Sequence, residues 1–177
     1  EDADTKVRML FQPRGAQIEA LYALEQTRED GATKGLVQAA TGVGKTYLAA
    51  FDSVKFKRVL FVAHREEILK QAAESFRNVR NTDDYGFFMG EVKDTDKSLI
   101  FASVASLGKK EYLNNKYFEK DYFDYIVIDE AQDMSEDEYS FVRALMKANE
   151  EMRVIAVGDD DQNIYEFRGS NSEHLKT

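Results

Sequence analysis

Short apolar runs alternate with amphipathic segments along the whole chain. The runs are continuously apolar and rich in β-branched and aromatic residues, which is typical of strands that are covered on both faces of a sheet. We therefore predict buried strands at residues 36–37, 59–63, 99–101, 125–128 and 154–157.

Apolar residues between these runs recur at the spacing of an α-helix. The first predicted helix covers residues 16–30, and another follows the second strand at residues 68–76. A third begins at a capping box formed by Ser135 and Glu138, and its apolar face continues to Met146. We expect loops near residues 30–34, 78–84, 90–97 and 108–121.

The alternation of strands and helices predicts one α/β domain over residues 1–177, with a mostly parallel central sheet between two layers of helices. The chain has one proline and no internal repeat or low-complexity stretch that would indicate a domain boundary. Because it starts with Glu1 rather than methionine, we expect it to be a piece of a longer protein.

Composition narrows the class of protein. No apolar run approaches the ~18 residues of a membrane span, so no membrane partner is expected. The chain has no cysteine, which removes disulfides and thiolate metal sites and agrees with a cytoplasmic location. The net charge of -9 argues against binding nucleic acid through bulk charge, so any such contact has to come from local groups on one face.

A glycine-rich segment follows the first predicted strand. Residues 39–46 read Ala-Ala-Thr-Gly-Val-Gly-Lys-Thr, and a helix is predicted from Tyr47 to Val54. The two glycines let the backbone curl so that successive N–H groups point at phosphate oxygens, and the helix adds its partial positive charge. We predict a phosphate-binding loop, with Ala39 at the position of the general pattern's first glycine. Its nucleotide-binding residues are Thr41, Gly42, Val43, Gly44, Lys45 and Thr46.

Two of these residues and two acids have assignable roles. The Lys45 ammonium can reach the β- and γ-phosphates of ATP, and the Thr46 hydroxyl can bind Mg²⁺. We expect Lys45 to be exposed in the empty loop, so that its replacement by alanine leaves the fold intact. Asp129 and Glu130 follow the strand at 125–128. Asp129 can hold Mg²⁺ through water, while Glu130 can orient and deprotonate the attacking water.

Each pattern alone also has a simpler interpretation. The loop is compatible with a glycine turn before a helix, and the acidic pair with a solvated strand end. Their occurrence together favours a nucleotide site. ATP is favoured over GTP, because guanine-specific domains usually carry Asn-Lys-x-Asp, whereas here Asn115-Lys116 continues as Tyr117-Phe118.

The first part of the chain resembles a known family. Residues 14–110, and in them Gln17 to Lys45 and the segment Val62-Ala63-His64-Arg65-Glu66-Glu67-Ile68-Leu69, are similar to the first, RecA-like motor domain of superfamily 2 helicases, including the restriction-enzyme and DEAH-like branches. The resemblance implies that Gln17 reads adenine and that His64 and Arg65 contact the nucleic-acid backbone. Residues 101–107 resemble the next backbone-contacting motif.

Residues 124–170 resemble a different group. Asp-Glu-Ala-Gln-Asp at 129–133 and Val-Gly-Asp-Asp-Asp-Gln-Asn-Ile-Tyr-Glu-Phe-Arg-Gly at 157–169 look like the UvrD/Rep-type helicases of superfamily 1. This resemblance implies that Gln162 senses the γ-phosphate and that Phe167 stacks on a base of single-stranded DNA, on the same face as His64. Natural divergence and an engineered join are both compatible with this change of resemblance along the chain.

Three of the roles implied by these resemblances have structural alternatives. Gln17 is also compatible with an exposed helix residue, His64 with a structural histidine, and Phe167 with a core aromatic.

The resemblances imply an ATP-driven helicase or translocase core that uses ATP and Mg²⁺ and moves on nucleic acid. The nucleic acid that they imply is single-stranded DNA. Its catalytic residues would be Lys45, Glu130 and Gln162. A second RecA-like domain of the parent protein is expected to supply arginines across the cleft. Two other interpretations use the same residues: a P-loop ATPase subunit of a restriction or repair system that does not separate strands, and a non-catalytic engineered module.

Overall fold

The computed structural model of the protein describes residues 13, 15–32, 34–38, 42–107, 122–129, 142–147, 149, 152–158 and 173–176. Its helices are α2 (Ala16–Glu29), α3 (Gly42–Ser53), α4 (Glu66–Arg80) and α5 (Val104–Leu107), and residues 142–147 are also helical. Its strands are β1 (Lys34–Gln38), β2 (Val59–Ala63), β3 (Tyr85–Met89), β4 (Val92–Lys93), β5 (Leu99–Ser103), β6 (Tyr125–Asp129), β7 (Arg153–Gly158) and β8 (Glu173–Lys176).

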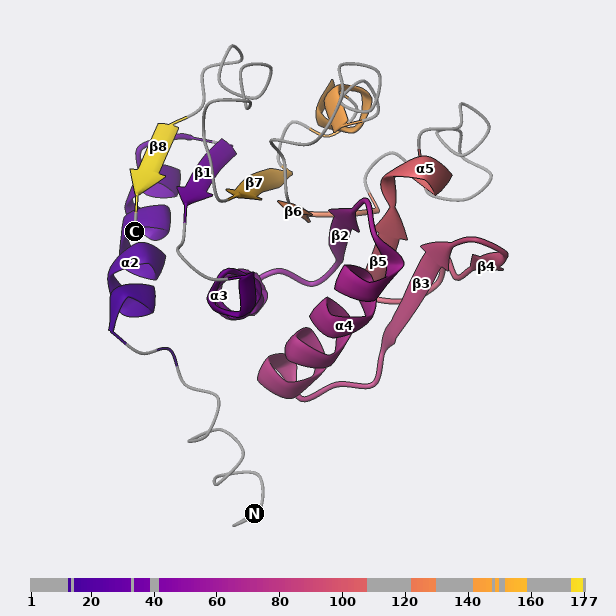
Figure 1. Ribbon diagram of the computed structural model, residues 1–177. Helices are drawn as coiled ribbons and strands as arrows, with labels where there is room; N and C mark the ends of the chain where they lie inside the picture. The colour runs from indigo at the N-terminus through magenta and orange to yellow at the C-terminus, as the bar shows by residue number, and fades with distance from the viewer. Residues whose placement is uncertain are drawn as a thin grey trace.

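The strands form one 8-stranded sheet in the order β4-β3-β5-β2-β6-β7-β1-β8 (Figure 1). Every neighbouring pair is parallel except β3 and β4, which are antiparallel. One row of paired residues crosses the centre of the sheet through Val62, Ile128, Ala156 and Leu36. The carboxyl ends of β2, β6, β7 and β1 therefore lie along one edge of the sheet, which we call the carboxyl edge.

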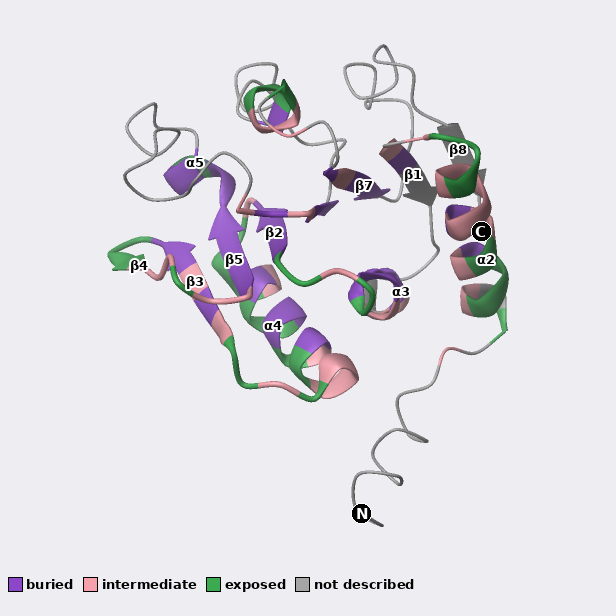
Figure 2. Cartoon of the chain, turned by 180° about the vertical axis from the view of Figure 1, so that it is seen from behind, coloured by how far each residue is buried: buried purple, intermediate pink, exposed green. Residues whose placement is uncertain are grey.

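Helices cover both faces of this sheet, so the domain has three layers (Figures 1 and 2). One core lies between the sheet and α2, α3 and α4, and the other between the sheet and α5 with residues 142–147. All residues of β2 are buried, and they alternate between the two cores: Phe61 belongs to the first, whereas Leu60 and Val62 belong to the second. The predicted three-layer α/β fold is confirmed.

An aromatic cluster fixes α4 on the sheet. The Phe76 ring of α4 meets the Phe61 and Phe101 rings edge-on, with centroids 5.6 and 5.5 Å apart. All three side chains are at most 1% exposed. Because α4 follows β2 directly, this packing also fixes the position of the turn that carries His64 and Arg65 at the carboxyl edge.

Several predicted boundaries were wrong. α3 begins at Gly42 rather than Tyr47, because the phosphate loop itself enters the first helical turn. β1 starts at Lys34 and α4 continues to Arg80, so the loops around 30–34 and 78–84 are shorter than expected. The expected loop at 90–97 contains β4.

Some elements carry weak signals in the sequence. The apolar pattern does not predict β3, β4, α5 or β8, because Gly86 interrupts the run of β3 and the other three elements have four residues or fewer. The predicted third helix is confirmed over 142–147, where Val142 is buried and Leu145 and Met146 pack against the core. Its capping box at Ser135 and Glu138 lies outside the described residues. No helix in the described part of the chain is long and apolar enough to cross a membrane.

Candidate nucleotide-binding site

The phosphate loop leads from β1 into the first turn of α3, at the carboxyl edge. The first N–H groups of a helix have no acceptor within the helix, and they carry partial positive charge. Gly44, Lys45 and Thr46 lie in this turn, and Thr46 is half-buried. The start of α3 thus brings helix N-terminal N–H groups and a lysine to one point of the edge, an arrangement suited to an anion.

The expectation that Lys45 is exposed was wrong. Lys45 is only 3% exposed. Helical side chains lean toward the helix N-terminus, so a lysine in the first turn of α3 lies against the carboxyl edge instead of extending into solvent.

Asp129 lies on the other side of β7 from the loop. It is the last residue of β6 and is 8% exposed. Asp129 pairs with Val157 of β7, which in turn pairs with Val37 of β1. Two strand spacings, ~10 Å, therefore separate the backbone of Asp129 from the end of β1.

The residues present fit a magnesium nucleotide. Among the described residues, no three His, Cys, Asp or Glu side chains come together as a metal site. The candidate Mg²⁺ ligands are instead the Thr46 hydroxyl and the Asp129 carboxylate. Such a sparse set suits Mg²⁺, which keeps several waters and binds through one or two protein oxygens and substrate phosphates.

Gln17 is brought to this loop by α2. It is the second residue of that helix, is half-buried, and its Nε2 donates to the Gly44 carbonyl oxygen at 3.4 Å. The two residues are far apart in the chain, so the contact depends on how α2 packs beside α3. The structure thus places the predicted adenine-reading residue next to the phosphate loop.

His64 and Arg65 follow β2 at the carboxyl edge. His64 is half-buried, whereas Arg65 is exposed and has extended backbone angles directly before α4. Because Val62 pairs with Ile128, this turn lies beside the end of β6. The nearby serines of residues 101–107 point inward: Ser103 is 6% exposed, and its Oγ accepts a hydrogen bond from the Ser106 amide at 3.2 Å.

Not every predicted site residue can be placed. Thr41, Glu130, Gln162 and Phe167 lie outside the described residues, so the predicted proximity of Phe167 to His64 remains a prediction. Gly42 and Val43 are described only as the backbone of the first turn of α3.

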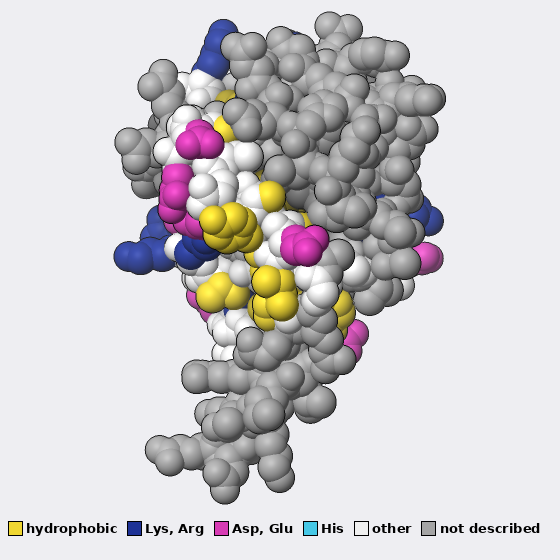
Figure 3. Space-filling model, turned by 90° about the vertical axis from the view of Figure 1, so that its left-hand side faces the viewer, with side chains coloured by type: hydrophobic (Ala, Val, Ile, Leu, Met, Phe, Trp, Pro, Cys, Tyr) yellow, Lys and Arg dark blue, Asp and Glu magenta, His cyan; other side chains and the backbone are white. Residues whose placement is uncertain are grey.

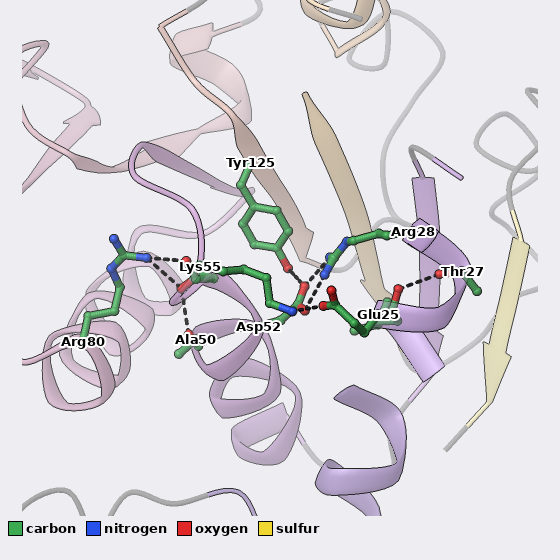
Figure 4. A network of polar contacts seen from close by, with 10 residues as sticks. Glu25, Thr27, Arg28, Ala50, Asp52, Lys55, Arg80 and Tyr125 are labelled. Carbon is green, nitrogen blue, oxygen red and sulfur yellow. Dashed lines mark hydrogen bonds and ion pairs between the residues drawn. The ribbon is translucent and has the colours of Figure 1, made fainter. Parts of the chain in front are cut away.

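The sequence patterns missed a buried polar cluster at the opposite edge of the sheet (Figure 4). Arg28 of α2 forms a two-pronged ion pair with Asp52 of α3, with 2.6 Å between Nη1 and Oδ1, and Nη2 bound to Oδ2. The Tyr125 hydroxyl of β6 donates to the same carboxylate. Asp52 and Tyr125 are at most 1% exposed. We call these three residues the Asp52 cluster.

Aromatic stacking encloses the Asp52 cluster. The Tyr125 and Phe56 rings are parallel, with centroids 4.4 Å apart, and the Arg28 guanidinium lies 5.2 Å from the Phe56 centroid. Burial and the Asp52 charge together raise the pKa of Tyr125 well above its usual range, so the hydroxyl remains a donor. Burial alone would lower the pKa of Arg28, but the hydrogen bond and charge of Asp52 outweigh it and raise that pKa.

Neighbouring contacts join α3 to the rest of this edge. Lys55 pairs with Glu25 of α2, and Arg80 of α4 donates to the carbonyl oxygens of Ser53 and Phe56, at 2.5 and 2.9 Å. One signal was available in the sequence: Asp52 falls on the apolar face of a predicted helix. Its partners could not be found there, because they lie far away in the chain.

A parallel α/β sheet with a phosphate loop on one strand and an acidic residue ending another defines a P-loop nucleotide-binding domain. The family pattern described as type III restriction enzyme, res subunit, matches residues 10–157. The chain belongs to this family, and it is a RecA-like helicase motor domain.

The curated relatives include both kinds of protein that residues 14–110 and residues 124–170 resemble. The chain is 31% identical over 128 residues to the type I restriction enzyme EcoKI endonuclease subunit of Escherichia coli, a match covering 65% of this chain and 11% of the relative. It is 35% identical over 79 residues to DNA helicase II of Salmonella typhimurium, covering 43% of this chain and 11% of the relative. The chain thus spans about a tenth of these relatives.

Solved structures agree on the fold. The Hef helicase domain of Pyrococcus furiosus superposes with a TM-score of 0.73 at 24% identity, over 96% of this chain and 39% of that one. The UvsW helicase of bacteriophage T4 gives a TM-score of 0.71 at 15% identity, over 94% of this chain and 60% of that one.

Proposed function

We propose that this domain binds ATP with Mg²⁺ and hydrolyses it, and that hydrolysis drives movement of the parent protein along DNA. The observation that carries the proposal is the buried Lys45 at the start of α3, separated by one strand from the buried Asp129. Membership of the family, and relatives that are ATP-dependent DNA helicases, support the same activity.

The chemistry assigned to the residues is hydrolysis of the γ-phosphate. Water attacks the γ-phosphorus, the bond to the β–γ bridging oxygen breaks, and ADP and phosphate are released. Glu130 accepts the proton of the attacking water, and Gln162 contacts the γ-phosphate. Lys45 neutralises charge on the phosphates, and Gln17 binds the base. Mg²⁺, held by Thr46 and Asp129, would supply further neutralisation of charge.

DNA would bind along the carboxyl edge, next to the nucleotide. Arg65 is exposed there and His64 lies beside it, so both can reach a phosphodiester backbone. Because the chain has a net charge of -9, we expect contacts from few residues and weak binding at physiological salt. The aromatic Phe167 would add base stacking to single-stranded DNA. A second RecA-like domain of the parent protein would close over the nucleotide.

Isothermal titration with a non-hydrolysable ATP analogue and Mg²⁺ tests the nucleotide site. We expect the chain to bind the analogue and Lys45→Met to lose most of that affinity, at least about tenfold, because a charge-assisted contact to phosphate disappears. Asp83→Asn is a matched control, since Asp83 is exposed and pairs with Arg77 at the far end of α4. Equal affinity of the chain and Lys45→Met would refute the site.

The family description favours a second function, translocation without strand separation. Restriction-type motors and helicases would share the ATP site described above and differ in what movement does to the duplex. The parent protein can be tested on two substrates, a forked duplex and a triplex whose third strand is displaced by translocation. ATP-dependent triplex displacement with an intact fork would favour the restriction-type motor, and opening of the fork would favour the helicase.

A further inference from the structure

The Asp52 cluster lies away from the proposed nucleotide site, yet each of its residues shares an element with a residue of that site. Arg28 and Gln17 are both on α2, Asp52 and Lys45 are both on α3, and Tyr125 and Asp129 are both on β6. The helical and strand rises place these pairs ~16, ~10 and ~13 Å apart. The cluster therefore ties together three elements without touching the phosphates.

The Asp52 cluster is one of the attachments of α2 to the domain. α2 lies at the side of the domain (Figure 1), and the face of the molecule in Figure 3 carries exposed hydrophobic side chains. Ile18 and Tyr22 of α2 are 54% and 68% exposed, and only Ala20 and Leu24 are fully buried among its described side chains. Two of its hydrogen-bonded contacts with α3 lie at opposite ends of α2, Gln17 to Gly44 and Arg28 to Asp52. The first is a long hydrogen bond of 3.4 Å, whereas the second is a buried ion pair with two bonds.

The attachment of α3 is more secure. Leu48, Ala49 and Ala50 are buried beneath it, and Arg80 of α4 binds the carbonyl oxygens at its end. Loss of Asp52 would therefore release α2 more than α3, and Gln17 would move while Lys45 stayed in place.

From this asymmetry we infer that Arg28, Asp52 and Tyr125 are positioning residues for the recognition of the base: they hold α2 so that Gln17 meets the nucleobase of a nucleotide whose phosphates are bound by α3. The inference rests on the proposed ATP site and deepens it. It assigns preference for adenine to a cluster at the opposite edge of the sheet, in addition to the residue that touches the base.

The test compares three ligands in the presence of Mg²⁺: a non-hydrolysable ATP analogue, the matching GTP analogue and inorganic tripolyphosphate. Asp52→Asn keeps the shape of the side chain and removes its charge. We expect it to reduce the preference for the ATP over the GTP analogue by about two- to tenfold. This is the change in affinity expected when one hydrogen bond, between Gln17 and the base, is displaced. The affinity for tripolyphosphate should stay within about twofold, because α3 keeps its place.

Controls separate this effect from general damage. Asp83→Asn breaks an exposed ion pair of the same type on α4 and should change none of the three affinities. Gln17→Ala should reproduce the loss of base preference directly. If Asp52→Asn does not fold by circular dichroism, Tyr125→Phe takes its place, since it keeps the ring stacked on Phe56 and removes only the hydroxyl.

Two results would overturn the inference. One is a folded Asp52→Asn, or a folded Tyr125→Phe in its place, that keeps the base preference of the unaltered chain. The other is an equal loss of affinity for all three ligands, which would indicate general loosening of the site. Failure of the proposed function looks different, because then the unaltered chain and Lys45→Met bind the ATP analogue equally.

Discussion

Lys45 is 3% exposed, and this burial decides how substitutions of Lys45 should be studied. An alanine at this position would remove a packed aliphatic stem as well as a charge, so a loss of binding could be confused with a loss of folding. Methionine keeps the stem and removes the charge.

In Lys45→Met, the ATP analogue should therefore no longer stabilise the folded state. A ligand at one hundred times its Kd stabilises the native state by about 2.7 kcal/mol. We expect the ATP analogue to raise the free energy of unfolding of the unaltered chain by about this amount, and that of Lys45→Met hardly at all. Urea unfolding with and without analogue measures the difference. Equal stabilisation of both proteins would show that Lys45 does not bind the phosphates.

Tyr125→Phe should change the pH dependence of stability. The Tyr125 hydroxyl donates to a buried carboxylate, so at pH 7 its removal should cost about 1.5–3 kcal/mol. The pKa of Tyr125 is higher in the folded than in the unfolded chain. Its contribution is thus fully present below the unfolded pKa of about 10, and is lost at about 1.4 kcal/mol per pH unit above it.

The measurement is urea unfolding of both proteins between pH 7 and pH 11. The difference in unfolding free energy between the unaltered chain and Tyr125→Phe should be constant up to about pH 9 and shrink above pH 10. A difference that is the same at pH 7 and pH 11 would mean that Tyr125 titrates alike in both states, contrary to its burial.

At this scale the sequence predicts residues whose motif is local, and misses those that depend on distant partners. Lys45, Thr46 and Gly44 are adjacent in the chain, so one glycine-rich string is enough to predict them. Arg28 and Asp52 come together only because α2 packs beside α3, and no local pattern reports that packing. The burial of Lys45 is missed for the same reason.

Among the elements, α2 packs closely on β1 at Gly35. A Cβ built on Gly35 would lie 3.1 Å from Leu24 Cδ2 and 3.8 Å from Ile155 Cγ2. Gly35 therefore allows α2 to pack directly on the strand that leads to the phosphate loop. This glycine is needed for space, since its backbone angles are ordinary for a strand.

Gly35→Ala should displace α2 and destabilise the domain by about 1–3 kcal/mol, the usual cost of overpacking a core. It should also weaken the contact between Gln17 and the loop. Gly15→Ala is the control for a backbone effect without overpacking. Nothing lies within 4 Å of a Cβ built on Gly15, but its φ of 51° disfavours alanine. Thermal and urea unfolding compare the two variants. An unchanged midpoint for Gly35→Ala would show that α2 can shift at no cost.

The elements that the sequence predicts are those with continuous apolar runs or a helical period, namely β1, β2, β5, β6, β7, α2, α3, α4 and the helix at residues 142–147. β3 is missed because Gly86 interrupts its pattern and its side chains alternate between half-buried and buried. Boundaries are less certain than elements, as the start of α3 shows. A helix that begins inside a glycine-rich loop has no capping residue or change of pattern to mark its first turn.

For the whole molecule, the position of the proposed site at the carboxyl edge has a kinetic consequence. The residues proposed for this site come from one domain, and we expect the transition state to require arginines from a second. Such residues contribute ~10³–10⁵ in rate. The 177-residue chain should therefore bind ATP but hydrolyse it far more slowly than the parent protein.

Turnover per molecule of the two proteins, measured with saturating ATP and with single-stranded DNA present and absent, checks this expectation. Glu130→Gln in the parent protein is the matched variant, since it keeps the shape of the side chain and cannot accept the proton of water at neutral pH. Equal turnover by the chain and the parent would mean that the catalytic residues are complete within this domain.

The buried strands and the predicted functional groups occupy different parts of the domain. The strands that set the register are apolar and buried, whereas the predicted functional groups are attached where strands end: the loop after β1, His64 after β2, and Asp129 at the end of β6. Recombination that joins lineages at a strand end would preserve both cores. The passage from superfamily 2-like residues 14–110 to superfamily 1-like residues 124–170 falls before β6, so two sets of motor parts can share one scaffold without repacking it.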